Sequence, residues 1–278
     1  EKGVRITPQH GLMDPEQDKL VVFLGGSTMW GTGSNNEHTI PAHFAKLGGG
    51  HYRVLNFGEA GYNAFQSYLF LQIQMMQGLR PDVIISYDGA NERARFQPGT
   101  RPFTHDRDRQ ITEIMKGQDK GAIKELSFKH FFLGPVSRFV EKLQEKFGTK
   151  APDQFDFSRP RAEQAARELL ESWLAMQRLA EDYDAEFLAV LQPNAATGSP
   201  KLDYLNLREY RLEAYRALYP EVRRLLETSD YSILKKNILP LTEVFDRDEA
   251  IYIDFCHVSP NGNRLVAERI YHVMNQSK

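Results

Sequence analysis

The stretch Leu20–Thr28, which reads LVVFLGGST, decides the fold. Five consecutive apolar residues that end at a glycine pair are typical of a short strand buried on both faces, as strands of parallel sheets are. Three further stretches have the same character, and longer segments separate them along the chain: RVLNF at 53–57, VIISY at 83–87 and EFLAVL at 186–191. The sequence therefore predicts four parallel strands.

Helical periodicity marks the segments around these strands. The first predicted helix follows Asn63-x-x-Gln66, a pattern typical of a capping box, and ends before Gly78 and Pro81. A second precedes the fourth strand, and a third opens at Ser259-Pro260. Strands that alternate with helices predict one α/β domain with a doubly wound parallel sheet. The apolar rows are Phe65, Tyr68, Leu69, Ile73 and Met76; Ala162, Ala165, Leu169, Trp173, Met176, Ala180 and Tyr183; and Leu265, Val266, Ile270 and Val273.

Two parts of the chain stand outside this alternation. Residues 1–18 form an N-terminal extension, and residues 93 to about 160 separate the third strand from the next helix, a length too great for a plain connection. The second part is rich in lysine, arginine and phenylalanine, and it predicts a mainly helical insertion over the carboxyl ends of the strands. A helical layer that only completes the core is the alternative. The phenylalanines are Phe96, Phe103, Phe128, Phe131, Phe132, Phe139 and Phe147.

Composition restricts the partners. Lys and Arg number 35 and Asp and Glu 37, a net charge of −2, which argues against nucleic acid. No apolar run reaches the length of about 18 residues that a transmembrane helix needs. The single cysteine, Cys256, rules out an intrachain disulfide and a four-cysteine zinc site. Because the chain starts at Glu1, we expect a signal peptide or membrane anchor upstream, and a cell-envelope or periplasmic location rather than a cytoplasmic one.

Polar and glycine-containing segments follow the first three predicted strands, and another precedes the last helix. They are GGST at 25–28, GEAGYN at 58–63, DGANE at 88–92 and DFCH at 254–257. In open parallel sheets ligands bind outside the carboxyl ends of the strands, so these segments are expected to meet.

Together they supply every part of an acyl-transfer site. Ser27 is a candidate nucleophile, and it needs an imidazole to take its proton. His257 provides that base, and Asp254, three residues earlier, can fix its tautomer. The backbone N–H groups of Ser27 and Gly61 and the side-chain amide of Asn91 can hold the oxyanion. Each residue alone is more often a turn or cap residue, but the joint occurrence of all five predicts an active site.

These segments resemble those of the SGNH hydrolases, the group related to GDSL esterases and lipases. The matching blocks are Gly25-Gly26-Ser27-Thr28, Gly61 within Glu59–Asn63, Gly89-Ala90-Asn91-Glu92 and Asp254–His257. The resemblance spans residues 20–275 without the insertion, and it implies a flavodoxin-like three-layer α/β/α sandwich. It also implies Ser27 as nucleophile, His257 as base, Asp254 as its partner, and an oxyanion hole of Ser27, Gly61 and Asn91. Gly26 and Glu92 stand where many relatives have Asp.

The resemblance implies a metal-free and cofactor-free serine esterase that forms a covalent acyl-enzyme. Its substrates would be O-acyl esters, such as acetyl groups on a cell-envelope polysaccharide, or short-chain lipid esters. Two alternatives remain open: an O-acyltransferase that uses the same residues on a cell-envelope polysaccharide, and an inactive carbohydrate-binding relative.

Three residues near the predicted site are candidates for substrate binding. Trp30 follows Ser27 by three positions and can line the acyl or alcohol pocket, or pack in the core. Arg93 and Arg95 can clamp a carboxylate or sulfate, or form structural ion pairs. Cys256 is expected to be a buried, inert thiol, since adjacent side chains on an extended segment point apart.

Overall fold

The structure, a computed structural model, describes residues 4–9, 18–105 and 155–276. Its centre is a sheet of five parallel strands in the order β2-β1-β3-β4-β5. The four apolar stretches form strands as predicted. The strands are β1 (Lys19–Gly25), β2 (Tyr52–Gly58), β3 (Val83–Asp88), β4 (Glu186–Leu191) and β5 (Ile238–Pro240). The sequence did not predict β5, which has only three residues and ends in a proline.

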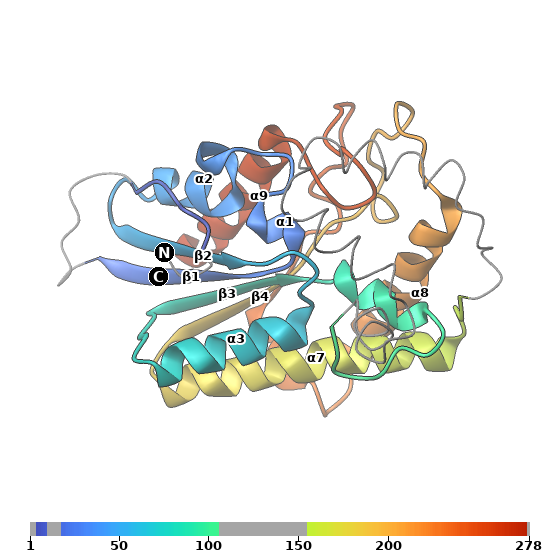
Figure 1. The fold of residues 1–278 in the computed structure, drawn as a ribbon, viewed down its shortest axis with the longest axis horizontal. Coiled ribbons are helices and arrows are strands. Elements are labelled where there is room, and N and C mark those ends of the chain that lie inside the picture. Colours follow the sequence, from blue (N-terminus) through green and yellow to red (C-terminus); the bar gives the residue numbers. More distant parts are fainter. Residues whose placement is uncertain (1–3, 10–17, 106–154, 277–278) are drawn as a thin grey trace, which may run out of the picture.

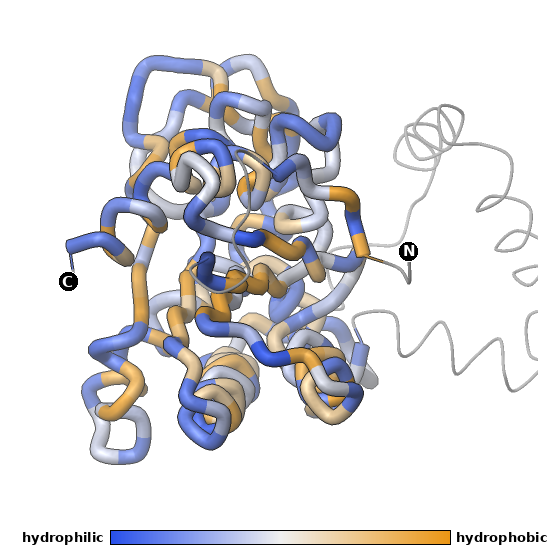
Figure 2. Tube along the Cα trace, turned by 90° about the vertical axis from the view of Figure 1, so that its left-hand side faces the viewer, coloured by the Kyte–Doolittle hydropathy of each residue, from blue (hydrophilic) through white to orange (hydrophobic). Residues whose placement is uncertain are grey.

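Helices cover both faces of the sheet, which gives the predicted three-layer α/β/α sandwich (Figure 1). On one face lie α2 (Ile40–Leu47) and α9 (Pro260–Gln276). On the other lie α3 (Ala64–Met76) and α7 (Arg159–Asp182), with α8 (Glu209–Leu226) packed against α7. Apolar residues gather on the strands between the layers, while hydrophilic residues line the outer turns (Figure 2). Short helical turns complete the described part: α1 (Ser27–Trp30), η1 (Asn36–His38), η2 (Asn91–Phe96) and η4 (Ser232–Asn237).

The helix α3 forms as predicted, but its predicted inner face is wrong. Asn63 accepts hydrogen bonds from the N–H groups of Phe65 and Gln66, so the capping box is present. Of the predicted row, however, Leu69, Ile73 and Met76 are exposed. The helix packs through its smaller and offset residues instead, which are Ala64, Ser67, Leu71 and Met75. The row predicted for α7 is buried from Ala162 to Ala180, as expected.

The two parts outside the strand–helix alternation are described only in part. Residues 4–9 run beside β2: Arg5 pairs with Asn56, and the Gln9 side chain bonds both backbone groups of Val54. Of the predicted insertion, the described residues hold η2, an irregular stretch to residue 105, and the approach to α7. The predicted helices and phenylalanines between 106 and 154 lie outside the described residues. No helix in the described part is long and apolar enough to cross a membrane.

Candidate active site

The candidate residues gather where the winding of the sheet reverses. After β1 the chain adds β2 on one side, and then returns to place β3 on the other side of β1. Ser27 follows β1 at the start of α1, and Asn91 follows β3 at the start of η2. Such a reversal leaves a crevice at the carboxyl ends of the two central strands, which is where α/β proteins of this topology bind ligands.

The turn between β1 and α1 is fixed by close backbone approach. Gly25 has a φ of +150°, and a Cβ there would lie 2.5 Å from the Tyr87 carbonyl oxygen, so only glycine fits. The buried Asn56 donates to the Met29 carbonyl oxygen at 3.1 Å and accepts from the Gly58 N–H at 2.9 Å. These bonds tie α1 to the end of β2 and so hold Ser27 in place.

Ser27, His257 and Asp254 form one continuous chain of hydrogen bonds. The Ser27 Oγ lies 2.8 Å from Nε2 of His257, and Nδ1 of the same ring lies 2.7 Å from Oδ2 of Asp254. The other carboxylate oxygen of Asp254 accepts the backbone N–H groups of Cys256 at 2.9 Å and His257 at 2.8 Å. The carboxylate therefore shapes its own turn and orients the imidazole at the same time.

The electrostatics of this chain favour a charged Asp254. Burial raises the pKa of Asp254, but the hydrogen bond and charge of His257 and the two backbone N–H groups outweigh it and hold the pKa below its ordinary value. Burial lowers the pKa of His257, but negative charge at Cys256 and Asp254, with hydrogen bonds to both, raises it to about 10.

Cys256 is buried as predicted, but its predicted orientation is wrong. Its Sγ lies 3.7 Å from Nδ1 of His257, so the two adjacent side chains do not point apart. The segment is a tight turn around the Asp254 carboxylate rather than an extended strand, and the turn brings both side chains to the same side.

The segments that carry Gly61 and Asn91 touch each other and Gly26. Asn91 donates its side-chain amide to the Tyr62 carbonyl oxygen at 2.7 Å. A Cβ at Gly26 would lie 2.4 Å from that amide nitrogen and 2.9 Å from the Tyr62 oxygen. Gly61 is buried, with a φ of +81°. Within the described part of the chain, no hydrogen bond from the backbone N–H group of Ser27 or Gly61 is found, as the predicted oxyanion hole requires.

A buried carboxylate that the sequence analysis left without a role joins the two segments. Glu92 accepts the Ala64 N–H at 2.9 Å and the Gly89 N–H at 3.0 Å, so it links the start of α3 to the turn after β3. Asp88 is buried nearby and accepts from Ser86 and from the Trp173 indole. Burial and the charge of Glu92 raise the pKa of Asp88. The signal in the sequence was the DGANE segment itself, with two acids in five residues.

The candidates for substrate binding have different surroundings. Arg95 is fully buried, pairs with Glu168 at 2.7 Å and bonds Thr104, so the geometry favours its structural interpretation. Arg93 is partly exposed and lies over the Phe255 ring, 4.9 Å from its centroid. Trp30 is partly exposed beneath the Arg5 guanidinium, which also donates to the Trp30 carbonyl oxygen.

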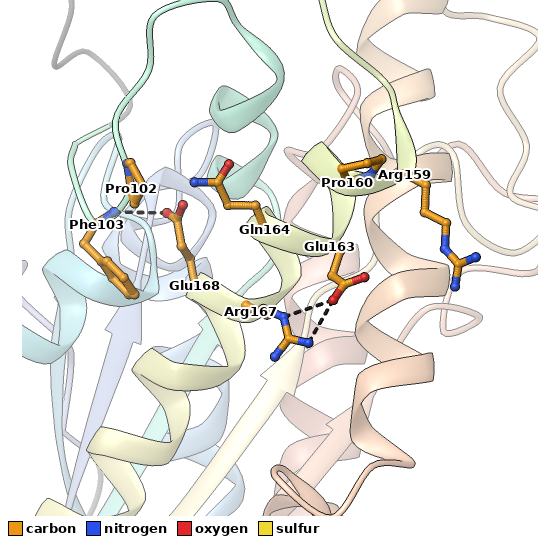
Figure 3. Close-up of a pocket in the computed structure, with 8 residues that line it drawn as sticks. All are labelled: Pro102, Phe103, Arg159, Pro160, Glu163, Gln164, Arg167 and Glu168. Atoms are coloured by element: carbon orange, nitrogen blue, oxygen red, sulfur yellow. Dashed lines mark hydrogen bonds and ion pairs between the residues drawn. The ribbon is translucent and has the colours of Figure 1, made fainter.

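A separate cavity of about 590 Å³ opens at the first turns of α7. Figure 3 shows its walls, with the Glu168 carboxylate accepting the Phe103 N–H and Arg167 paired with Glu163. None of the candidate catalytic or oxyanion residues lines it. Its lining residues are Pro102, Phe103, Arg159, Pro160, Glu163, Gln164, Arg167 and Glu168.

Among the described residues, one group brings three metal-ligating atoms together. Asp254, Cys256 and His257 offer atoms within 4.8 Å of one another. The same carboxylate and imidazole already bond each other and the backbone, so a metal would have to displace those bonds. The expectation of metal-free and cofactor-free chemistry stays a prediction.

Comparison with known proteins gives the fold. No protein-family model matches the chain, and no curated protein sequence matches it. Solved structures do match over nearly the whole chain. A candidate arylesterase of Agrobacterium tumefaciens str. C58 is 13% identical with a TM-score of 0.54, and the match covers 93% of this chain and 99% of that one.

A carbohydrate acetylesterase family member from Sinorhizobium meliloti is 15% identical with a TM-score of 0.51, over 93% of this chain and 98% of that one. A lipase, Lip_vut3, from a goat rumen metagenome is 14% identical with a TM-score of 0.50, over 91% and 96%. The chain therefore shares the fold of these solved structures, an α/β fold with a parallel sheet as the sequence predicted.

Proposed function

We propose that the protein is a serine esterase that removes O-acyl groups, acetyl above all, from a carbohydrate through a covalent acyl-enzyme. The observation that carries the proposal is the chain of hydrogen bonds from Ser27 through His257 to Asp254, 2.8 and 2.7 Å long. A serine hydroxyl is a weak nucleophile unless an oriented imidazole takes its proton. Both distances lie within the range that such proton transfer needs.

In the first half of the reaction, Ser27 Oγ bonds the ester carbonyl carbon while His257 Nε2 takes the hydroxyl proton. The carbonyl oxygen becomes an oxyanion, which the N–H groups of Ser27 and Gly61 and the Asn91 amide hold. The tetrahedral intermediate then breaks its bond to the alcohol oxygen, and His257 gives the proton to the leaving alcohol. The carboxylate of Asp254 stabilises the imidazolium that exists between these steps.

In the second half, water attacks the acyl group on Ser27 while His257 again acts as base. The acid leaves, and the Ser27 hydroxyl is restored. If a sugar hydroxyl takes the place of this water, the same residues perform acyl transfer. The carbohydrate substrate is supported by the name of the Sinorhizobium meliloti neighbour, and the small acyl group by the word acetylesterase in it.

A fluorophosphonate probe tests for the activated serine. We expect the wild type to be labelled, the label to be lost in Ser27→Ala, and the label to persist in Ser229→Ala, which removes an exposed serine outside the site. A folded wild type that takes no label would favour the inactive carbohydrate-binding relative.

A product assay separates hydrolysis from transfer. Acetylated xylan is incubated with the enzyme, with and without an unacetylated oligosaccharide acceptor. Acetate release that the acceptor does not reduce supports the esterase. Acetyl groups that appear on the acceptor, with little free acetate, would instead establish the acyltransferase.

A further inference from the structure

Two arginines converge on one aromatic ring beside the candidate triad. Phe255 stands between Asp254 and Cys256 in the chain and is buried. The guanidinium carbon of Arg93 lies 4.9 Å from the centroid of its ring, and that of Arg211 lies 4.7 Å from it. Arg93 comes from η2, two residues after Asn91, and Arg211 comes from α8.

Arg93 has no acidic partner among the described residues. No ion pair joins its guanidinium to a carboxylate there, and its buried Nε has no hydrogen-bond partner. This distinguishes it from Arg95, whose guanidinium is bonded to Glu168 and Thr104. Asp254, which precedes Phe255 in the chain, already uses its carboxylate for His257 and the backbone. Glu92, which precedes Arg93, accepts the backbone N–H groups of Ala64 and Gly89.

Stacking on a ring leaves the donors of a guanidinium available. An arginine that lies over an aromatic face directs its N–H groups outward in its own plane, where they fit the two oxygens of a carboxylate. Arg93 is also partly exposed, so an incoming group can reach it. With Arg211 over the same ring, the two positive charges raise the local attraction for an anion.

From this arrangement we infer that Arg93 forms an anion subsite next to the acyl site, and that the natural substrate is an acyl ester of an acidic glycan, one whose sugar carries a carboxylate. The inference rests on the proposed esterase function and adds the charge of its substrate. Because the acyl group is small, the carboxylate belongs to the alcohol side of the ester. Arg93 is thus a specificity-determining residue that contacts the sugar, and the triad performs the chemistry.

The test uses two aryl acetates that differ in charge, 4-acetoxybenzoate and 4-acetoxybenzamide, with acetate release as the readout. The intrinsic reactivities of the two esters cancel when their kcat/KM ratio is compared between variants. We expect Arg93→Gln to lower the ratio of the anionic to the neutral ester about tenfold, as loss of a hydrogen bond to a charged group does. Arg93→Lys should keep part of the preference, and added salt should weaken the wild-type preference.

Arg216→Gln is the matched control, because Arg216 lies on α8 as Arg211 does but is exposed and paired with Glu213. Its ratio should equal that of the wild type. If Arg93→Gln slows both esters equally, Arg93 only packs on Phe255 and the inference is wrong. If Arg93→Gln hydrolyses both esters at the wild-type rates, the inference is wrong as well.

A binding measurement tests the inference without turnover. Calorimetry on Ser27→Ala should show tighter binding of oligogalacturonate than of neutral xylo-oligosaccharide, and the difference should vanish in Ser27→Ala/Arg93→Gln. Equal binding of both sugars refutes the anion subsite even when the enzyme is an esterase. Selective binding with no esterase activity on any substrate would instead remove the proposed function and leave the subsite.

Discussion

Replacing Asp254 with Asn tests the proposed proton relay at a single atom. The Oδ1 of Asp254 accepts two backbone N–H groups, and Oδ2 accepts Nδ1 of His257. In Asp254→Asn the amide oxygen keeps the two backbone bonds, so the amide NH₂ faces Nδ1. The ring must then accept at Nδ1 and carry its proton on Nε2, where it donates to Ser27 and cannot take the serine proton.

The size of the effect follows from two competing costs. The wrong tautomer costs about 10⁴ in rate in a serine protease triad, or about 5 kcal/mol of barrier. The amide can instead flip, which restores the tautomer but turns NH₂ toward the two backbone donors. Leaving those donors unpaired costs about 2–6 kcal/mol, at about 1–3 kcal/mol each. The variant reacts through whichever of these two states has the lower free-energy cost, the wrong tautomer or the flipped amide. We therefore expect kcat to fall between about 30-fold and 10⁴-fold.

The assay is kcat and KM on 4-nitrophenyl acetate, with thermal unfolding as the check on the fold. Asp254→Asn should unfold near the wild-type temperature, because the turn keeps its backbone bonds, whereas Asp254→Ala should lose both the turn and the activity. Asp246→Asn is the control, since Asp246 also accepts a backbone N–H, from Ser199 at 2.6 Å, but lies outside the site. A folded Asp254→Asn that retains kcat within about threefold of the wild type contradicts the relay.

Three other predictions concern neighbouring groups. The raised pKa of His257 favours its protonated form, which cannot act as base, so the acidic limb of the pH–rate profile should lie above the ordinary value near 6.5. Cys256→Ser removes the sulfur atom that lies 3.7 Å from Nδ1 of His257 and should move that limb to lower pH; an unmoved limb assigns the shift to Asp254. The pKa of Asp88 is raised on folding to about 7, so the native state binds its proton more tightly and stability should fall as pH rises from about 4 to about 7. Urea unfolding should show a smaller loss of stability over this pH range in Asp88→Asn than in the wild type. An equal loss in both would show that Asp88 does not cause the pH dependence. Glu92→Gln places an amide donor where one carboxylate oxygen accepts a backbone N–H group, from Ala64 or Gly89. This variant should lower kcat more than it raises KM, and its unfolding free energy should fall by about 1–3 kcal/mol. Full activity in that variant would show that the link to Ala64 does not matter for catalysis.

The parts of the fold that sequence predicted are those encoded locally. The four longer strands are short stretches dominated by apolar residues, and the capping box of α3 is a pattern of four residues. The triad segment was also predictable, because Asp254 and His257 are three residues apart and one turn joins them. The strand β5 has no such signal, since three residues that end in proline look the same in a loop.

What sequence could not give depends on contacts between distant segments. The exposed row on α3 follows from which side of the helix meets α7, and periodicity alone does not choose between two apolar sides. Arg95 pairs with the acidic Glu168 on a helix far along the chain, whereas Arg93, two residues away, has no acidic partner among the described residues and lies over the Phe255 ring. The two arginines look alike in sequence, and only the fold separates a buried ion pair from a candidate subsite.

Gly26 shows how a departure from the SGNH pattern that the sequence resembles is tied to the rest of the site. Its φ of −85° is open to any residue, so conformation does not require glycine there. Contact does, because a Cβ would lie 2.4 Å from the Asn91 amide nitrogen. The aspartate that many relatives carry at this position therefore fits only if that amide moves away, and with it the bond to Tyr62 that holds Asn91 beside Gly61. In this chain the missing side chain at 26 and the placement of the Asn91 amide depend on each other, so neither can be exchanged for the family residue alone.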